Sequence, residues 1–594
     1  MESPIDLPAL PARRASMHPS ITIPALSENH KGLRTLDVAC LIINKVIGGG
    51  IFVSPGIVAQ LTGNKLIALA LWVFGGLYSF CSTYIYLEYG LSWPYNGGEF
   101  LYISKVFPIP PLFFASAFSW FFIAFATPTT NSITFARYIN PNNAEDPDVW
   151  FTKFFACVIV VGICAMHYCF VTVGIAANKF LAGYKVLFLG VMVIAGLIET
   201  CRQGALGRLQ GVGDYTMTHG SPSATNIALA ILQVLYTYQG WENANYVISG
   251  IKGVGEHRNR RLKWGALIAV TVVVMLYISF NMFFFILEFQ TITHQKHNVA
   301  ADYVIKVFRS SNDTMASNAI YVCIALAAAG NIVGVTFSNA RVIREIAKDR
   351  LIPFYGFFSK SSIYGRDKWD DLGTPTGGLI LQALATCITI ASIQPFHSVL
   401  NLYTYGHAVV CFILGIGVLY IRKRIIQYDT KSADPMRHGF DLPAEYQVLK
   451  KHRYRYIAVA FFTLVHLFLV IVPFIPSRNP DGSHRDMQSW VHPVVVSAFY
   501  VFGALVALYV LGFVEGLTFR GSEYNFAQNS DGRLFREYNE RRWIVQFSDR
   551  PRDWKTLFDL FKPLQWRIVK VRLQQNGEAE AADKLRTSAE AYSN

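Results

Sequence analysis

The sequence predicts an all-α polytopic membrane protein with 12 transmembrane helices. Three observations lead to this fold class. Apolar residues make up 52% of the 594 residues. Charged residues make up only 15%, whereas soluble domains carry roughly a quarter. Long stretches without charge alternate with short charged clusters. This pattern excludes a soluble enzyme and a nucleic-acid-binding protein, and the net charge of +14 is typical of basic cytoplasmic loops.

Twelve apolar stretches approach or exceed the length of about 20 residues that a bilayer crossing requires. They cover residues 36–61, 66–91, 111–139, 151–171, 178–199, 223–250, 264–288, 318–340, 376–395, 399–420, 456–476 and 491–517. The first 35 residues are polar, and no apolar stretch follows a charged start. We therefore expect no cleavable signal peptide, and we expect the first span itself to target the chain.

Basic residues set the expected orientation of these spans. Three basic clusters, at 252–263, 341–368 and 422–455, fall in loops on the same side as the N-terminus. Because Lys and Arg are enriched in cytoplasmic loops, we expect both termini to be cytoplasmic. The sequon at Asn312 then lies in an external loop, where it is a candidate for glycosylation.

The spans define four parts of the chain. We predict a cytoplasmic tail at 1–35, a transport core at 36–424, helices 11 and 12 with their preceding loop at 425–517, and a cytoplasmic tail at 518–594. No soluble domain is inserted between them.

The first span contains three consecutive glycines, Gly48, Gly49 and Gly50. Each weakens a helix by about 1 kcal/mol relative to alanine. Backbone that unwinds at this depth is tolerated only where it lines a cavity or is buried in protein. The half-helix that follows would present free N–H groups to a carboxylate. Close helix packing on a glycine face is the alternative explanation.

The sixth span is interrupted at a corresponding place. Its apolar run gives way to Tyr236, Thr237, Tyr238, Gln239 and Gly240. Interrupted spans at equivalent positions of two halves indicate a transporter's midplane site. We therefore predict an inverted five-plus-five repeat with broken helices 1 and 6, followed by two C-terminal helices.

Several segments resemble the amino acid/polyamine/organocation transporters, especially the L-type amino acid transporters. They are residues 47–55 (IGGGIFVSP), 236–241 (YTYQGW), 97–102 (GGEFLY) preceded by Glu88 and Gly90, 337–341 (FSNAR) and 350–353 (RLIP). Within that group, the sequence as a whole is similar to the fungal high-affinity methionine permeases. The resemblance spans about residues 36–424. It implies secondary active import of a neutral amino acid, with methionine as the first candidate, at a plasma membrane.

The chain departs from the family pattern at three places. Gly49 stands where a Ser is usual, and Gln239 stands where a Gly is usual. The connection at 140–150 has no Cys. Heteromeric L-type transporters use a Cys there to bind a glycoprotein heavy chain, so we expect no such partner.

Backbone groups at the two breaks suit a zwitterion. The N–H groups of Gly48, Gly49 and Gly50 suit its carboxylate, and the carbonyls of Val46, Ile47, Tyr236 and Thr237 suit its ammonium. Tyr238 and Gln239 complete the predicted site. The resemblance places Tyr236 at an aromatic gate. A purely packing role is the alternative.

Charged residues inside spans are functional candidates. Lys185 matches a family lysine placed against the first and eighth helices, and it is the first candidate for proton coupling, against a fixed structural cation. Lys45 either senses the proton, biases the cytoplasmic gate or extends to the inner interface. Glu88 and Glu242 are candidate carboxylate partners. His167, His407 and His466 are interpreted as ordinary polar residues of the bundle.

Other functions remain alternatives to an importer. They are a neutral amino acid exchanger, a nutrient-sensing receptor related to transporters, and a membrane-embedded enzyme. The sequence has no catalytic triad, metal-ligand cluster or P-loop motif. We therefore expect no enzyme activity, no cofactor and no metal, with a proton gradient as the driving force. The resemblance further implies ubiquitination on the cytoplasmic tails, with Lys31 as the candidate acceptor.

Overall fold

The computed structural model describes most of the helical part of the chain. The described residues are 32–107, 113–140, 148–202, 224–253, 255–288, 299–308, 313–349, 351–360, 374–392, 396–431, 454–474, 491–513, 518–520, 524–528, 534–538 and 542–544. The candidate residues Lys31 and Asn312 lie outside them.

Helix occurs in every one of the twelve predicted ranges. The α-helices are α1 (Thr35–Val46), α2 (Ser54–Thr62), α3 (Lys65–Ser92), α4 (Glu99–Val106), α5 (Phe113–Phe125), α6 (Thr129–Tyr138), α8 (Val149–Cys169), α9 (Val171–Arg202), α10 (Ala224–Thr237), α11 (Gly255–Glu288), α12 (Val299–Phe308), α13 (Asp313–Lys348), α14 (Tyr355–Phe358), α15 (Thr376–Ser392), α16 (Phe396–Lys431), α17 (Tyr454–Ile471) and α18 (Val491–Phe513). Within the described residues, eight helices are long and apolar enough to cross a membrane. The chain is therefore a multi-pass membrane protein.

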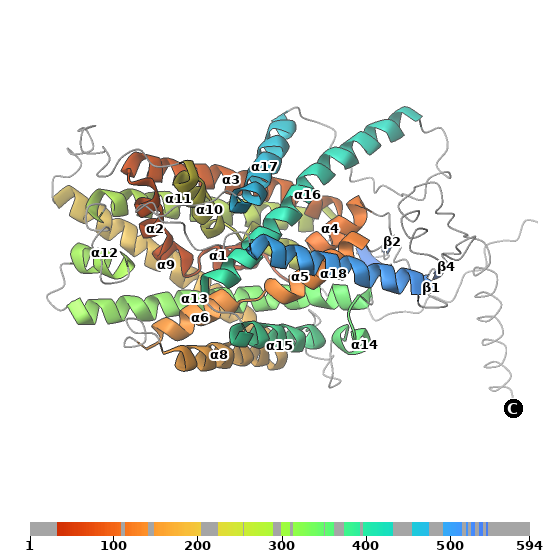
Figure 1. Cartoon of the computed structure of the whole chain (residues 1–594), viewed down its shortest axis with the longest axis horizontal. Coiled ribbons are helices and arrows are strands. Elements are labelled where there is room, and N and C mark those ends of the chain that lie inside the picture. Colours follow the sequence, from red (N-terminus) through yellow and green to blue (C-terminus); the bar gives the residue numbers. More distant parts are fainter. Residues whose placement is uncertain are drawn as a thin grey trace, which may run out of the picture.

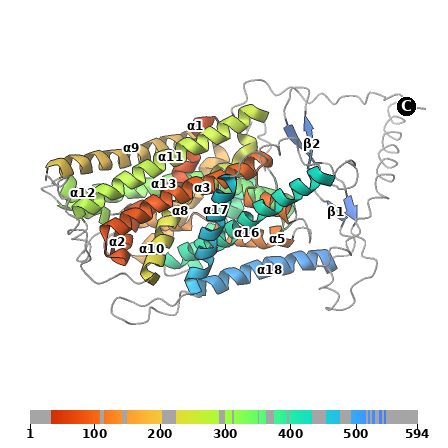
Figure 2. The same cartoon turned by 90° about the horizontal axis from the view of Figure 1, so that it is seen from above.

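The helices form an elongated bundle whose long members run mostly along its length (Figure 1). α1 lies inside this bundle and packs against α9, α11 and α13. α18 lies beside α5, and α17 packs against α16 and α3 (Figure 2). The short helix at the centre is thus enclosed by longer ones.

The first and sixth predicted spans are both broken. α1 ends at Val46, a short 3-10 helix covers Gly50–Phe52, and α2 starts at Ser54. α10 ends at Thr237, and a 3-10 segment, η4, covers Trp241–Gly250. Local sequence causes both breaks, because glycines and polar residues interrupt the apolar runs there.

The two breaks touch each other. Gly240 has a φ of +143°, and a Cβ atom at this position would lie 2.9 Å from the backbone nitrogen of Val46. Only a glycine fits this backbone conformation and this close approach. The contact places the end of α1 directly against the end of α10.

Several boundaries differ from the sequence prediction. The third predicted span is divided into α5 and α6 by a turn that ends at Pro128. Proline has no N–H and disfavours helix in the residue before it, which explains the division. α13 continues eight residues beyond the predicted end at 340 and α16 eleven beyond 420. Charged residues end an apolar run without ending the helix that carries it.

Some short elements were not predicted as such. α4 follows two glycines with positive φ, Gly97 (+118°) and Gly98 (+51°). In the C-terminal tail, β1 (Thr518–Arg520) pairs antiparallel with β4 (Arg542–Ile544), and β2 (Tyr524–Gln528) pairs antiparallel with β3 (Leu534–Tyr538). The apolar-span criterion used on the sequence does not detect such elements.

We expect Gly75→Ala to destabilise the bundle. The new Cβ atom would lie 2.6 Å from side-chain atoms of both Tyr238 and Val234. Such overpacking costs about 1–3 kcal/mol. Thermal unfolding of the purified protein should show a lower midpoint. Gly183→Ala in α9 is the matched control, because nothing lies within 4 Å of its Cβ position. An equal response of both variants would contradict this packing.

Candidate functional site

A polar cavity of about 80 Å³ lies between the two helix breaks. Residues of the first break, the turn between α5 and α6, α10, α13 and α16 line it. They are Lys45, Val46, Gly48, Gly50, Phe125, Ala126, Thr127, Pro128, Thr130, Asn131, Tyr236, Thr237, Gln239, Asn331, Val335, Asn339 and Tyr403. One water needs about 10–15 Å³ on this measure, so the cavity has room for a small polar ligand.

The structure brings most of the predicted binding residues to this cavity. Val46, Gly48, Gly50, Tyr236, Thr237 and Gln239 line it. Ile47, Gly49 and Tyr238 do not. Tyr238 is fully buried, and its ring packs 5.8 Å from that of Trp72. It supports the second break from behind.

Backbone groups of the first break already have partners in this conformation. The Gly48 N–H donates to the Val46 carbonyl (3.0 Å), and the Gly49 N–H donates to Asn131 Oδ1 (3.2 Å). The Val46 carbonyl also accepts from the hydroxyl of Tyr277 (3.1 Å). Gly50, which lines the cavity, is the glycine best placed to offer its N–H to a ligand.

Lys185 lies where the family resemblance placed it, between α1 and α13. Its side chain is fully buried. Its Nζ atom donates to the carbonyls of Asn44 (3.0 Å) and Ile47 (2.5 Å). A Cβ atom on Gly330 of α13 would lie 2.8 Å from Lys185 Cε. The glycine therefore leaves the space through which the lysine reaches α1.

Lys45 does not extend to an interface, and that interpretation is wrong. Its Nζ atom lies 2.8 Å from Glu242 Oε1 and 4.9 Å from the ring centre of Tyr246. The exposed fraction is 9% for the Lys45 side chain and 0% for that of Glu242. Glu242 therefore forms a buried ion pair with Lys45, which itself lines the cavity.

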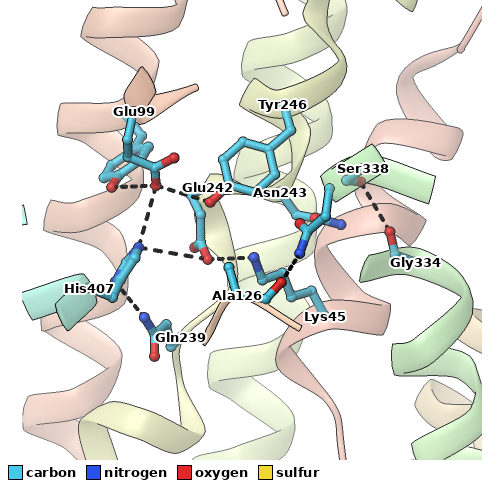
Figure 3. A network of polar contacts seen from close by, with 12 residues as sticks. Lys45, Glu99, Ala126, Gln239, Glu242, Asn243, Tyr246, Gly334, Ser338 and His407 are labelled. Carbon is cyan, nitrogen blue, oxygen red and sulfur yellow. Dashed lines mark hydrogen bonds and ion pairs between the residues drawn. The ribbon is translucent and has the colours of Figure 1, made fainter. Parts of the chain in front are cut away.

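The interpretation of His407 as an ordinary polar residue is wrong. Neither the contacts of His407 nor those of Glu99 were predicted from the sequence. Figure 3 shows His407 between Glu99 and Glu242, with Gln239 beside it. Its Nε2 atom lies 3.4 Å from Glu99 Oε1 and 4.0 Å from Glu242 Oε1. Its Nδ1 atom contacts the Gln239 amide. In the sequence, Glu99 stands out only as part of the family motif at residues 97–102.

Glu99 is held by hydroxyl groups as well. The hydroxyls of Tyr86 (2.9 Å) and Tyr246 (3.1 Å) donate to its Oε1 atom. Glu88 lies apart from this cluster and from the cavity lining, and it accepts a hydrogen bond of 2.6 Å from Tyr84 in its own helix. The structure therefore pairs one of the two predicted carboxylates, Glu242, with a lining residue and leaves Glu88 away from the cavity.

The other two predicted ordinary histidines lie outside this cluster. The His167 ring contacts the carbonyl of Val333 (3.1 Å), and the His466 ring contacts the Tyr78 hydroxyl (3.0 Å). Both are buried, and each contacts a residue of another helix. The expectation of an ordinary polar role agrees with these contacts.

Three asparagines of the cavity wall were not predicted. Asn131 receives the Gly49 N–H, Asn331 donates to the Lys45 carbonyl (2.7 Å), and Asn339 donates to the Ala126 carbonyl. The sequence signal for them is weak, because a single amide in an apolar helix is common. They hold broken backbone in place and give the cavity its uncharged polar wall.

Comparisons with known proteins identify the family of the chain. A family model described as "Amino acid permease" matches residues 33–514. The high-affinity methionine permease of Saccharomyces cerevisiae is 25% identical over 495 residues, which cover 81% of this chain and 79% of that protein. The low-affinity methionine permease of the same yeast is 24% identical over 478 residues, with coverages of 79% and 81%. The Asc-type amino acid transporter 1 of Homo sapiens is 25% identical over 342 residues, with coverages of 56% and 62%.

We expect Glu99→Ala to destabilise the protein strongly. It removes the acceptor of two buried hydroxyl groups and the carboxylate that faces His407. Breaking one partner out of a buried charged network costs about 3–5 kcal/mol. A thermal unfolding measurement should show a marked fall in the midpoint. The exposed Glu256→Ala of α11 serves as control and should stay within about 0.5 kcal/mol of wild type. Equal midpoints for both variants would exclude a structural role of Glu99.

Proposed function

The chain belongs to the amino acid permease family, and from this premise we propose that it imports a neutral amino acid by alternating access. The single observation that carries the proposal is the polar cavity between two facing helix breaks, in which the one charged lining side chain, Lys45, is paired with Glu242. A zwitterion needs acceptors for its ammonium and donors for its carboxylate, without a buried unpaired charge. The side-chain amides, the hydroxyls and the exposed backbone of the breaks meet that requirement.

The carboxylate would lie against Gly50 and the start of α2, where the positive end of a helix dipole favours an anion. Tyr236 supports this placement, because its Cε1 atom lies only 3.5 Å from the Cβ position of Gly50. Its ring would then cover a bound substrate, as the family's aromatic gate does. The carbonyls of Val46 and Ile47 would receive the ammonium only after exchanging their present partners.

Methionine is the first candidate substrate. Its support is that the two yeast relatives are methionine permeases, each of which aligns over about four fifths of both chains. We further propose twelve spans in an inverted five-plus-five arrangement with two additional helices. Both termini would be cytoplasmic, and the plasma membrane would be the site of action.

Proton symport is the proposed driving mechanism, with Lys185 as the first candidate for the coupling residue. A lysine held by carbonyl groups at the first break links its own charge to the geometry of that break. Lys45, Glu88 and Glu242 are the remaining candidates. An exchanger without net ion coupling and a nutrient-sensing receptor are the alternative functions.

Three proposals concern partners and modification. The lack of a cysteine at 140–150 supports a transporter without a glycoprotein heavy chain. Ubiquitination at Lys31 and glycosylation at Asn312 stay predictions from the sequence. The decisive measurements for these are internalisation of a Lys31→Arg variant and the electrophoretic mobility of an Asn312→Gln variant.

Gly50→Leu should abolish amino acid uptake while the protein still reaches the membrane. The Leu side chain would project from the break toward Tyr236 and fill the space proposed for the carboxylate. Uptake of labelled methionine by cells with equal surface amounts of each variant measures this. Gly190→Leu is the control, since nothing lies within 4 Å of its Cβ position. Normal uptake by the Gly50 variant would sink the carboxylate assignment.

Lys185→Ala should remove the pH dependence of substrate accumulation, while exchange of internal for external amino acid continues. The measurement is uptake at several external pH values, with and without a proton uncoupler. Insensitivity of the wild type to the uncoupler would identify an exchanger instead. A Lys185 variant with the wild-type pH profile would assign coupling to another residue.

A further inference from the structure

One charged side chain lines the cavity. Among the seventeen lining residues that the structure describes, Lys45 is the one Lys, Arg, Asp or Glu. The others are apolar, hydroxyl-bearing or amide side chains and glycines. A single uncompensated cation in such a wall would attract anionic ligands and repel cationic ones.

The charge of Lys45 is compensated by a carboxylate that does not line the cavity. Its ammonium lies 2.8 Å from Glu242, whose side chain is fully buried and does not line the cavity. Among the described residues, Glu242 Oε2 has no hydrogen-bond partner. His407 Nε2 lies 4.0 Å from the same Oε1 atom that Lys45 contacts, and Glu99 is its own nearer carboxylate. The lysine is therefore the principal counter-charge of Glu242.

We propose that Lys45 is a built-in counter-cation that screens Glu242 from the substrate and so restricts the site to amino acids with uncharged side chains. The inference rests on the proposed function and adds the residue pair that determines its substrate class. The pair leaves the cavity without net charge. Neither a cationic nor an anionic side chain then finds an opposite charge there to offset its loss of hydration.

The pair predicts opposite changes when either member is removed. Lys45→Ala opens space at the cavity wall and leaves the Glu242 carboxylate as an acceptor for a cationic side chain. Glu242→Gln keeps the shape and leaves the Lys45 ammonium facing the cavity for an anionic side chain. A site that offers no opposite charge excludes amino acids with charged side chains without making any contact with the neutral substrate.

The test measures competition in cells that express each variant. Labelled methionine is the tracer, and excess unlabelled L-lysine, L-ornithine and L-glutamate are the competitors. Uptake of labelled L-lysine and L-glutamate is measured in parallel, so that each variant is also scored without methionine. Lys45→Ala, Glu242→Gln and the double variant are compared with wild type. Lys153→Ala is the matched control, because Lys153 is in α8, does not line the cavity and donates to the Ala391 carbonyl.

In Lys45→Ala, lysine and ornithine should compete at concentrations about tenfold lower than in wild type, the effect of one hydrogen bond between charged groups. In Glu242→Gln, glutamate should show the corresponding gain. The double variant should show neither gain, and Lys153→Ala should match wild type. The two single variants shift in opposite directions, so a general loosening of the cavity does not reproduce this pattern.

The outcomes separate this inference from the proposed function. Wild-type cells that take up no neutral amino acid would contradict the proposed function. Wild-type uptake of neutral amino acids together with unchanged competition in both single variants would overturn the counter-cation role alone. If Lys45→Ala does not reach the membrane, the competition by glutamate in Glu242→Gln alone tests the counter-cation role. If neither single variant reaches the membrane but the double variant does, the pair is a structural ion pair and the inference fails.

Discussion

The satisfaction of broken backbone inside an apolar bundle is the constraint on which the rest of this structure depends. Hydrocarbon offers no hydrogen bonds, so every N–H and C=O group released at a helix break needs a partner from the protein. Lys185 donates hydrogen bonds to two carbonyls at the end of α1, and the Tyr277 hydroxyl donates to a third. Asn243 donates to the carbonyl of Leu41 (2.8 Å). Such partners make a non-helical segment stable at this depth.

The same constraint explains why the cavity forms where it does. Gly240 brings the second break against Val46 so closely that no side chain fits between them. Aromatic rings close the space behind this contact, with Tyr238 packed 5.1 Å from Tyr277 and Trp241 packed 5.1 Å from Tyr78. The remaining open side faces the amides of α6 and α13. The polar surface that steadies the breaks thereby becomes the wall of a binding site.

The two buried lysines near the first break have different surroundings. Lys185 donates to two carbonyl oxygens, which hold the end of α1 to α9, and its hydrogen-bond partners in the described part of the chain include no carboxylate. Lys45 lies on the cavity side and is paired with Glu242. Lys185 is therefore suited to respond to movement of the break, and Lys45 is suited to set the charge that a substrate meets.

The sequence by itself determined the membrane class, the approximate positions of the apolar helices and the two breaks. Each of these properties is local: about 20 apolar residues span a bilayer, and consecutive glycines unwind a helix wherever it packs. It also identified most backbone positions of the site, because they lie within the breaks themselves. Helix ends were less predictable, as α13 and α16 show, because a polar extension beyond the bilayer has no periodic signal that fixes its length.

Only the tertiary structure decided which side chains meet at the cavity wall. His407 lies 308 residues from Glu99 along the chain, and a lone histidine in an apolar helix has the same sequence pattern whether it is bonded locally or across the bundle. Asn131 and Asn339 were overlooked for that reason. Lys45 could equally have extended to the interface, and the rotation of α1 against η4 turned it toward Glu242. Such rotations result from the packing of many apolar side chains at once, so no short stretch of sequence predicts them.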